Sequence, residues 1–130
     1  MKKVAKLVMI DDNDNYLLMY RSDHPAFGDD PDLPGGTLED GETTLETMLR
    51  EVEEEAGVVL APEDVEEVYG GSEYFAHGTY YALYRVKLAE RLTIAMSWEH
   101  SSYEWIPRDE FIEKSSNAVD TYMHMVADKI

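Results

Sequence analysis

The sequence predicts an α/β fold in which a mixed β-sheet is packed between α-helices. Segments rich in β-branched and aromatic residues recur along the chain, as strands require. An amphipathic helical segment interrupts them after the second strand, and a second helical region closes the chain. The resulting order is strand, strand, loop, helix, four strands and helix, which favours a sheet covered by helices.

The first third of the chain predicts a hairpin followed by a long loop. Residues 4–10 and 16–21 form strands on either side of the polar turn sequence DDNDN. Residues 22–36 contain three prolines and three glycines, which predict a loop. Long loops in compact domains tend to be functional, so His24 and Phe27 in this loop could close over a ligand.

The helix after the loop has clear ends. Thr43 or Thr44 caps its start, and Gly57 ends it after Ala56. The second half of the chain predicts further strands, a turn at Pro62 and a helical end that breaks at residues 115–116. The four strands span residues 69–75, 78–87, 91–97 and 103–107, with residues 58–60 as a candidate for a further short strand, and the last helix spans residues 117–127.

Length and composition exclude several classes of protein. The 130 residues suit a single domain spanning residues 1–130. The chain has no cysteine, which excludes disulfides, thiolate nucleophiles and cysteine-bound zinc, and suits a reducing, cytoplasmic location. The first apolar run meets acidic residues where a signal peptide has small ones, so we expect a strand. No segment has the roughly 18 apolar residues of a membrane span.

The net charge of −17 comes from 28 acidic and 11 basic residues. Such a surface repels nucleic-acid backbones and anionic lipids, so we expect no extended nucleic-acid surface and no membrane partner. It also repels a polyanionic small molecule, unless divalent cations lie between that molecule and the protein.

The acidic residues of the predicted helix fall on different sides of it. With a turn of about 100° per residue, the apolar positions form one stripe that faces the core. Glu51, Glu54 and Glu55 lie on one arc beside this stripe, whereas Glu53 lies on the other flank with Arg50. Like charges this close repel each other, and a divalent cation reverses the sign of that interaction. A solvated acidic face is the commoner explanation of a glutamate-rich helix. The residues that flank the helix therefore decide between a solvated face and a metal-binding site.

These flanking residues match a longer pattern. Residues 36–58 read Gly, five residues, Glu, seven residues, then Arg-Glu-apolar-x-Glu-Glu-x-Gly-apolar. Chance agreement at all the fixed positions is on the order of one in 10⁸. On these residues the chain resembles the Nudix hydrolase family, which implies the Nudix fold with a mixed sheet between helices. Members of that family cleave a diphosphate linked to another moiety X, usually a nucleoside, with Mg²⁺ or Mn²⁺.

The resemblance implies roles for the residues of the helix. Glu51, Glu54 and Glu55 are then the metal-binding carboxylates, and Glu51 alternatively positions or deprotonates the attacking water. Arg50 is then a structural partner, catalytically important because it orients one of these carboxylates. The carbonyl of Gly35 often corresponds to a metal ligand in such proteins.

The same resemblance covers residues outside the helix. Glu42 ties the loop to the helix, and Gly36 and Gly57 permit a tight backbone. Glu99, in the segment WEHSSYEWIP, corresponds to a glutamate that serves as general base or further metal ligand, with a solvated loop carboxylate as the alternative. His100 either contacts a phosphate or is an ordinary surface imidazole, and the second interpretation is slightly favoured.

Contacts to the substrate follow from residue type and position. Arg21 ends a strand that should border the cleft, so it binds a phosphate or pairs with nearby acids. Tyr74, Tyr80 and Tyr103 either stack on a base or pack in the sheet, and packing is the commoner use of strand aromatics.

Three functions are consistent with the sequence. The first is a metal-dependent pyrophosphohydrolase acting on a nucleoside triphosphate or a related nucleoside diphosphate derivative. The second is a dinucleoside polyphosphate hydrolase, because the segment EH-x-x-Y-x-W resembles one found in such Nudix enzymes. The third, of a different class, is a non-catalytic Nudix-fold module that binds a nucleotide, which the presence of all three glutamates disfavours. Many members of the family dimerise, so a homodimer is a further prediction.

Overall fold

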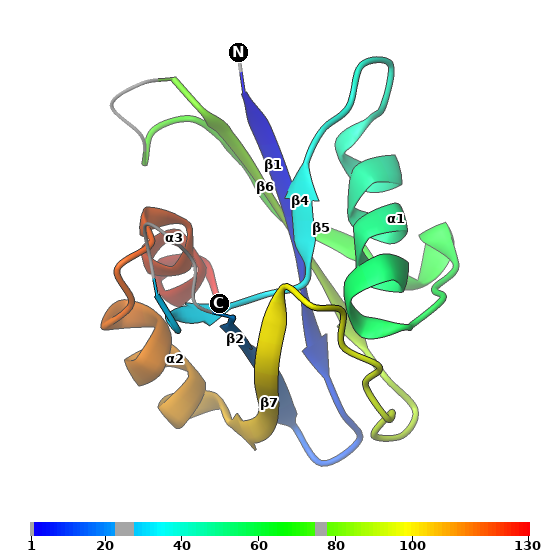
Figure 1. Ribbon diagram of the computed structural model, residues 1–130, viewed down its shortest axis with the longest axis vertical. Helices are drawn as coiled ribbons and strands as arrows, with labels where there is room; N and C mark the ends of the chain where they lie inside the picture. Colours follow the sequence, from blue (N-terminus) through cyan, green and yellow to red (C-terminus); the bar gives the residue numbers. More distant parts are fainter. Residues whose placement is uncertain (1, 23–27, 75–77) are drawn as a thin grey trace.

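Figure 1 shows a β-sheet between helices in the computed structural model, which describes residues 2–22, 28–74 and 78–130. The strands are β1 (Lys3–Ile10), β2 (Asn15–Arg21), β3 (Pro31–Asp32), β4 (Gly35–Thr37), β5 (Glu66–Gly71), β6 (Tyr80–Lys87) and β7 (His100–Pro107). The helices are α1 (Thr44–Ala56), the 3₁₀ helix η1 (Pro62–Asp64), α2 (Arg108–Ser116) and α3 (Thr121–Lys129). Because α1 lies on one side of the sheet and α2 and α3 on the other, the predicted α/β fold is confirmed.

β1 gives the sheet its mixed character. It pairs in parallel with β6 along its whole length and antiparallel with β2 and β4. The main strand order is β3-β2-β1-β6-β5, and β7 pairs with β2. On one edge, β1 has β4 beside residues 4–6 and β2 beside Ile10. The cleft described below opens where these two neighbours of β1 separate.

Alternation along the central strands builds a core on each face of the sheet. Leu7 of β1 and Tyr84 of β6 pack with Val52 of α1 on one face. Val8 of β1 packs with Met123 of α3 on the other face. Both faces are therefore buried, as expected for a sheet that helices cover on both sides.

The ends of α1 confirm the sequence prediction. The hydroxyl of Thr43 accepts a hydrogen bond from the Glu46 N–H, and the Glu46 carboxylate accepts one from the Thr43 N–H. Gly57 follows the helix with a φ of 69°, in the left-handed region. A Cβ at Gly57 would also lie 2.8 Å from the Cβ of Ala95, so both the backbone conformation and the space favour glycine there.

Two predicted strands are wrong. Residues 58–60 and residues 91–97 are both described, and neither segment contains a strand. In the second segment Ile94 is buried, and the Ala95 N–H donates to the carbonyl of Ala56 at 2.9 Å. Its apolar residues therefore pack at the end of α1 as a loop, because apolar alternation indicates burial without specifying a partner strand.

Several predicted ends of strands and helices also differ from those in the structure. The strand predicted at residues 69–75 is β5, which begins at Glu66 and ends at Gly71. The loop at residues 22–36 contains β3 and β4, which pair with β2 and β1. β7 begins at His100, earlier than predicted, and α3 begins only after Asp120, whose carboxylate caps it. Within the described ranges, none of the helices has the length and apolar character needed to cross a membrane.

Candidate active site

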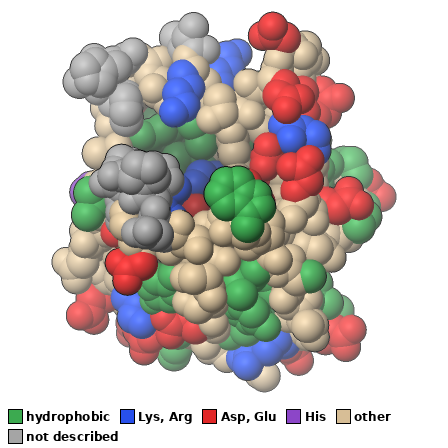
Figure 2. All heavy atoms as spheres, viewed as in Figure 1, with side chains coloured by type: hydrophobic (Ala, Val, Ile, Leu, Met, Phe, Trp, Pro, Cys, Tyr) green, Lys and Arg blue, Asp and Glu red, His purple; other side chains and the backbone are tan. Residues whose placement is uncertain are grey.

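A cleft of about 890 Å³ lies beside the first half of β1, between α1 and the start of α3. One wall is acidic and consists of Glu51 and Glu55 from α1, with Glu99 from the loop before β7. Gly35 and Gly36 of β4 lie in the same wall. Figure 2 shows acidic side chains gathered over α1, with basic atoms in the hollow beside them.

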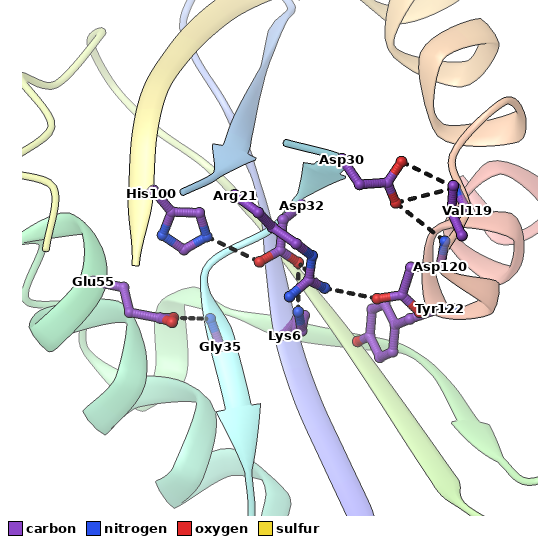
Figure 3. Close-up of polar contacts among 10 residues, drawn as sticks. All are labelled: Lys6, Arg21, Asp30, Asp32, Gly35, Glu55, His100, Val119, Asp120 and Tyr122. Carbon is purple, nitrogen blue, oxygen red and sulfur yellow. Dashed lines mark hydrogen bonds and ion pairs between the residues drawn. The ribbon is translucent and has the colours of Figure 1, made fainter. Parts of the chain in front are cut away.

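The opposite wall carries charges of both signs, which come from four different elements (Figure 3). The Lys6 ammonium lies 2.5 Å from Oδ1 of Asp32. The Arg21 guanidinium lies 3.2 Å from the same oxygen and 2.7 Å from Oδ2 of Asp120. These ion pairs join β1, β2 and β3 to the start of α3, and they fix the wall that faces the acidic residues.

Glu55 is the most buried carboxylate of the acidic wall, with 3% of its surface exposed. Its Oε2 accepts a hydrogen bond of 2.7 Å from the Gly35 N–H. Burial, reinforced by the charges of Glu99 and Asp32, raises the pKa of Glu55 to about 9 against the opposing effects of the Gly35 N–H and Lys6. The charge of Lys6 thus acts on Glu55 without offsetting the cost of burying its carboxylate.

Glu51 occupies space that Gly36 leaves free. A Cβ at Gly36 would lie 2.9 Å from Cδ of Glu51, so a side chain there would displace the carboxylate. Arg50 Nη1 donates to Oε1 of Glu51 at 2.8 Å. Burial raises the pKa of Glu51, and the charges of Glu54 and Glu99 add to this effect while Arg50 opposes it.

Arg50 links the acidic wall to the loop before α1. Its Nε and Nη2 donate to the two carboxylate oxygens of Glu42 at 2.8 and 3.0 Å. This bond is the main reason that the pKa of Glu42 falls to about 2. Although the helical pattern places Arg50 on the opposite flank, its long side chain reaches back to Glu51 and lies 3.6 Å from Glu54.

Two further predicted site residues differ in their placement. Glu99 lines the cleft, and its carbonyl accepts a hydrogen bond of 2.9 Å from the Ser22 N–H. The side chain of Glu54 is 59% exposed and lies outside the lining of the cleft, near Arg50. The structure therefore brings Glu51, Glu55 and Glu99 into one wall and leaves Glu54 at its margin.

The acidic wall fits a divalent cation with open coordination. Its donors are hard carboxylate oxygens, which Mg²⁺ and Mn²⁺ prefer, and the charges of Glu54 and Glu99 act on Glu51 from nearby. Among residues 2–22, 28–74 and 78–130, no three acidic or histidine side chains lie close enough together to hold an ion. A cation in this wall must therefore complete its coordination with water and ligand oxygens, as Mg²⁺ commonly does beside phosphates.

The residues predicted to contact the substrate fall into two groups. Arg21 and Tyr74 line the cleft, where Arg21 pairs with acids and the Tyr74 hydroxyl donates to Asp128. Tyr80 and Tyr103 do not line the cleft, and both pack against the core on the α1 face. His24 and Phe27 lie outside the described residues.

The favoured interpretation of His100 as a surface imidazole is wrong. Because β7 extends to residue 100, His100 is the cross-strand partner of Arg21 in β2. The residue is 5% exposed, and its Nε2 lies 2.9 Å from Oδ2 of Asp32. His100 thus holds the Asp32 carboxylate in place through this contact, and it does not itself line the cleft.

The sequence analysis did not identify Lys6, Asp32 or Asp120. Lys6 stands alone in the apolar run VAKLVMI, and a lone lysine in a buried strand indicates either a partner carboxylate or a site. Asp32 and Asp120 carry no comparable local signal, because their partners lie 26 and 99 positions away in the chain.

Comparison with protein families assigns residues 1–126 to the NUDIX domain. The chain belongs to the Nudix family. Members of this family are hydrolases that act on phosphoric anhydrides. A comparison with curated proteins finds no match.

Solved structures share this Nudix fold. A MutT/nudix family protein from Enterococcus faecalis is 25% identical over 80% of this chain, with a TM-score of 0.68, and this chain covers 42% of its length. A MutT protein from Methanosarcina mazei is 20% identical, with coverages of 97% and 89% and a TM-score of 0.75. An Ap4A hydrolase from C. elegans is 19% identical, with coverages of 99% and 94% and a TM-score of 0.68.

Proposed function

We propose that this Nudix protein is a metal-dependent pyrophosphohydrolase that cleaves the diphosphate of a nucleoside triphosphate or a related nucleoside diphosphate derivative. The observation that carries the proposal is the convergence of Glu51, Glu55 and Glu99 on one wall of a single cleft. The cleft volume of about 890 Å³ is within the range for ligands of nucleotide size.

Several side chains in or beside the cleft then have a proposed task. Glu51 and Glu55 would hold Mg²⁺ or Mn²⁺, which would neutralise charge on the phosphate oxygens and lower the pKa of a bound water. Glu99 or Glu51 accepts the proton of the attacking water on a carboxylate oxygen. Arg50 holds Glu51 in place through its bond to Glu42. Arg21 faces the anionic part of the substrate from the opposite wall.

The dinucleoside polyphosphate alternative rests on the segment EH-x-x-Y-x-W and on the Ap4A hydrolase among the similar folds. In this chain His100 is buried and Tyr103 packs against the core. Because neither side chain lines the cleft, these two positions do not favour a second nucleoside, and we retain the mononucleotide substrate.

A nucleotide panel tests the proposal. Nucleoside triphosphates, nucleoside diphosphate derivatives and dinucleoside polyphosphates are incubated with Mg²⁺, with Mn²⁺ or with EDTA, and the products are identified. We expect turnover of a nucleoside triphosphate or diphosphate derivative only with a divalent cation. Tight nucleotide binding that needs no metal, without turnover of any compound, would instead indicate a binding module.

A pair of adjacent substitutions tests the metal-binding side of α1. Glu54 lies at the margin of the acidic wall, and the family pattern makes it a metal ligand. Glu54→Gln is therefore expected to lower kcat/KM by about 10²-fold, because a lost metal ligand removes several kcal/mol of charge stabilisation. Glu53→Gln is the matched control, since Glu53 is exposed on the other flank, and we expect its kcat/KM within about twofold of the wild type. Equal losses in the two variants would refute the separate role of Glu54.

The proposal includes a small-molecule partner. The net charge of −17 supports a nucleotide-type substrate over an extended nucleic-acid chain, because only a substrate held through bound cations avoids the repulsion. The single domain over residues 1–130, the homodimer, the cytoplasmic location and the choice between Mg²⁺ and Mn²⁺ stay predictions.

A further inference from the structure

Lys6 is a nearly buried lysine in the cleft, with a side chain that is 9% exposed. Its ammonium lies 2.5 Å from Oδ1 of Asp32 and 5.4 Å from the centre of the Tyr122 ring. An ammonium in such a place is costly unless a carboxylate pairs with it. Asp32 supplies this carboxylate, and Arg21 and His100 orient it at 3.2 and 2.9 Å.

A second carboxylate, that of Glu55, lies on the other side of Gly35 from Lys6 (Figure 3). Lys6 is the cross-strand partner of Gly35, and the Gly35 N–H donates to Glu55. A Cβ at Gly35 would lie 2.6 Å from Cγ of Lys6. The glycine therefore leaves room for the lysine stem, and its backbone lies beside both Lys6 and Glu55.

Two carboxylates of the cleft, those of Asp32 and Glu55, can therefore compete for the Lys6 ammonium. Its flexible four-carbon stem carries a compact charge that can turn from one acidic group to another. The acidic wall attracts this charge, because Glu51, Glu55 and Glu99 line the same cleft as Lys6.

We propose that Asp32 is a positioning residue that holds the Lys6 ammonium away from Glu55 and so keeps the acidic wall free for a divalent cation. The inference rests on the proposed metal-dependent function. A Lys6 side chain paired with Glu55 would occupy a metal ligand and place a positive charge beside the ion. Asp32 prevents this competition by offering Lys6 a better-oriented partner.

Mn²⁺ binding without nucleotide tests the inference in a double-mutant cycle. The Kd is measured by calorimetry and by electron paramagnetic resonance of free Mn²⁺. Asp32→Asn releases Lys6 towards Glu55, and the Kd is expected to rise about 10-fold. Lys6→Met removes the competing charge, and the Kd is expected to fall about threefold. The double variant is expected to recover at least the wild-type Kd, because no lysine remains to compete.

Asp30→Asn is the matched control. The Asp30 carboxylate accepts hydrogen bonds from the Val119 and Asp120 N–H groups at 3.0 and 3.1 Å, so it holds the start of α3. Its substitution is expected to change thermal stability and to leave the Kd for Mn²⁺ within about twofold. A rise in Kd as large as that of Asp32→Asn would overturn the specific role of Asp32.

The remaining outcomes separate the inference from the proposed function. An unchanged Kd in Asp32→Asn overturns the inference alone, as does a double variant that stays as weak as Asp32→Asn. If circular dichroism shows that Asp32→Asn is unfolded, Lys6→Met decides: tighter Mn²⁺ binding supports the inference, and unchanged or weaker binding overturns it. If the wild type binds no Mn²⁺, the metal-dependent function fails, and the inference fails with it.

Discussion

Glu55→Gln is expected to lower kcat by about 10²- to 10³-fold and to raise the stability of the metal-free protein at the same time. The loss of activity follows because the amide carries no charge to hold a divalent cation, which is worth several kcal/mol in the transition state. The fold should persist, since the glutamine oxygen can still accept the hydrogen bond from the Gly35 N–H. Steady-state kinetics with Mg²⁺ or Mn²⁺ measure the first effect.

The gain in stability follows from the raised pKa of Glu55. In the metal-free folded protein Glu55 keeps its proton up to a pH of about 9, whereas its reference value is 4.5. Between these values the folded state binds more protons than the unfolded state, so the free energy of unfolding falls as the pH rises. Glutamine has no proton to lose, and at pH 7 the variant should be more stable by on the order of 2 kcal/mol.

Urea denaturation in EDTA at several pH values checks this second effect. The wild type should lose stability from pH 5 to about pH 9 through Glu55, and Glu55→Gln should lack that component of the slope. Glu53→Gln is the control, because Glu53 is exposed and should retain both the activity and the pH slope of the wild type. A Glu55→Gln variant with wild-type activity would show that Glu55 does not bind the metal.

Gly35→Ala is expected to prevent the chain from folding. Gly35 has a φ of +145°, and a Cβ there would lie 2.3 Å from the carbonyl oxygen of Ala5 and 2.5 Å from the Cα of Lys6. These are backbone atoms of the neighbouring strand, so they cannot move aside without breaking the pairing of β1 with β4. The cost should exceed about 4 kcal/mol, a large share of a typical domain's stability. Circular dichroism and thermal denaturation measure the result.

Gly41→Ala is the matched control for Gly35→Ala. Gly41 also has a positive φ, of +84°, but no atom lies within 4 Å of its Cβ position. The substitution should therefore cost only the backbone term of about 1–2 kcal/mol. If Gly35→Ala melted at the same temperature as Gly41→Ala, the close contact between β1 and β4 would be wrong.

The sequence by itself determined the features whose signals are local. Thr43, Glu46 and Gly57 mark the ends of α1 within a few residues of each other, and the structure confirms those ends. The mixed sheet between helices could also be predicted, because apolar alternation and helical periodicity each report on neighbouring positions. The same logic misassigned residues 91–97, since an apolar pattern shows that Ile94 is buried but not what covers it.

Only the tertiary structure decided which side chains share the cleft. The helical pattern grouped Glu51, Glu54 and Glu55, yet only Glu51 and Glu55 line the cleft, because β4 packs against that part of α1. The network of Lys6, Asp32 and His100 joins three strands far apart in the sequence. Periodicity reports which way a side chain points from its own element, whereas a buried ion pair depends on what lies opposite, and distant segments decide that.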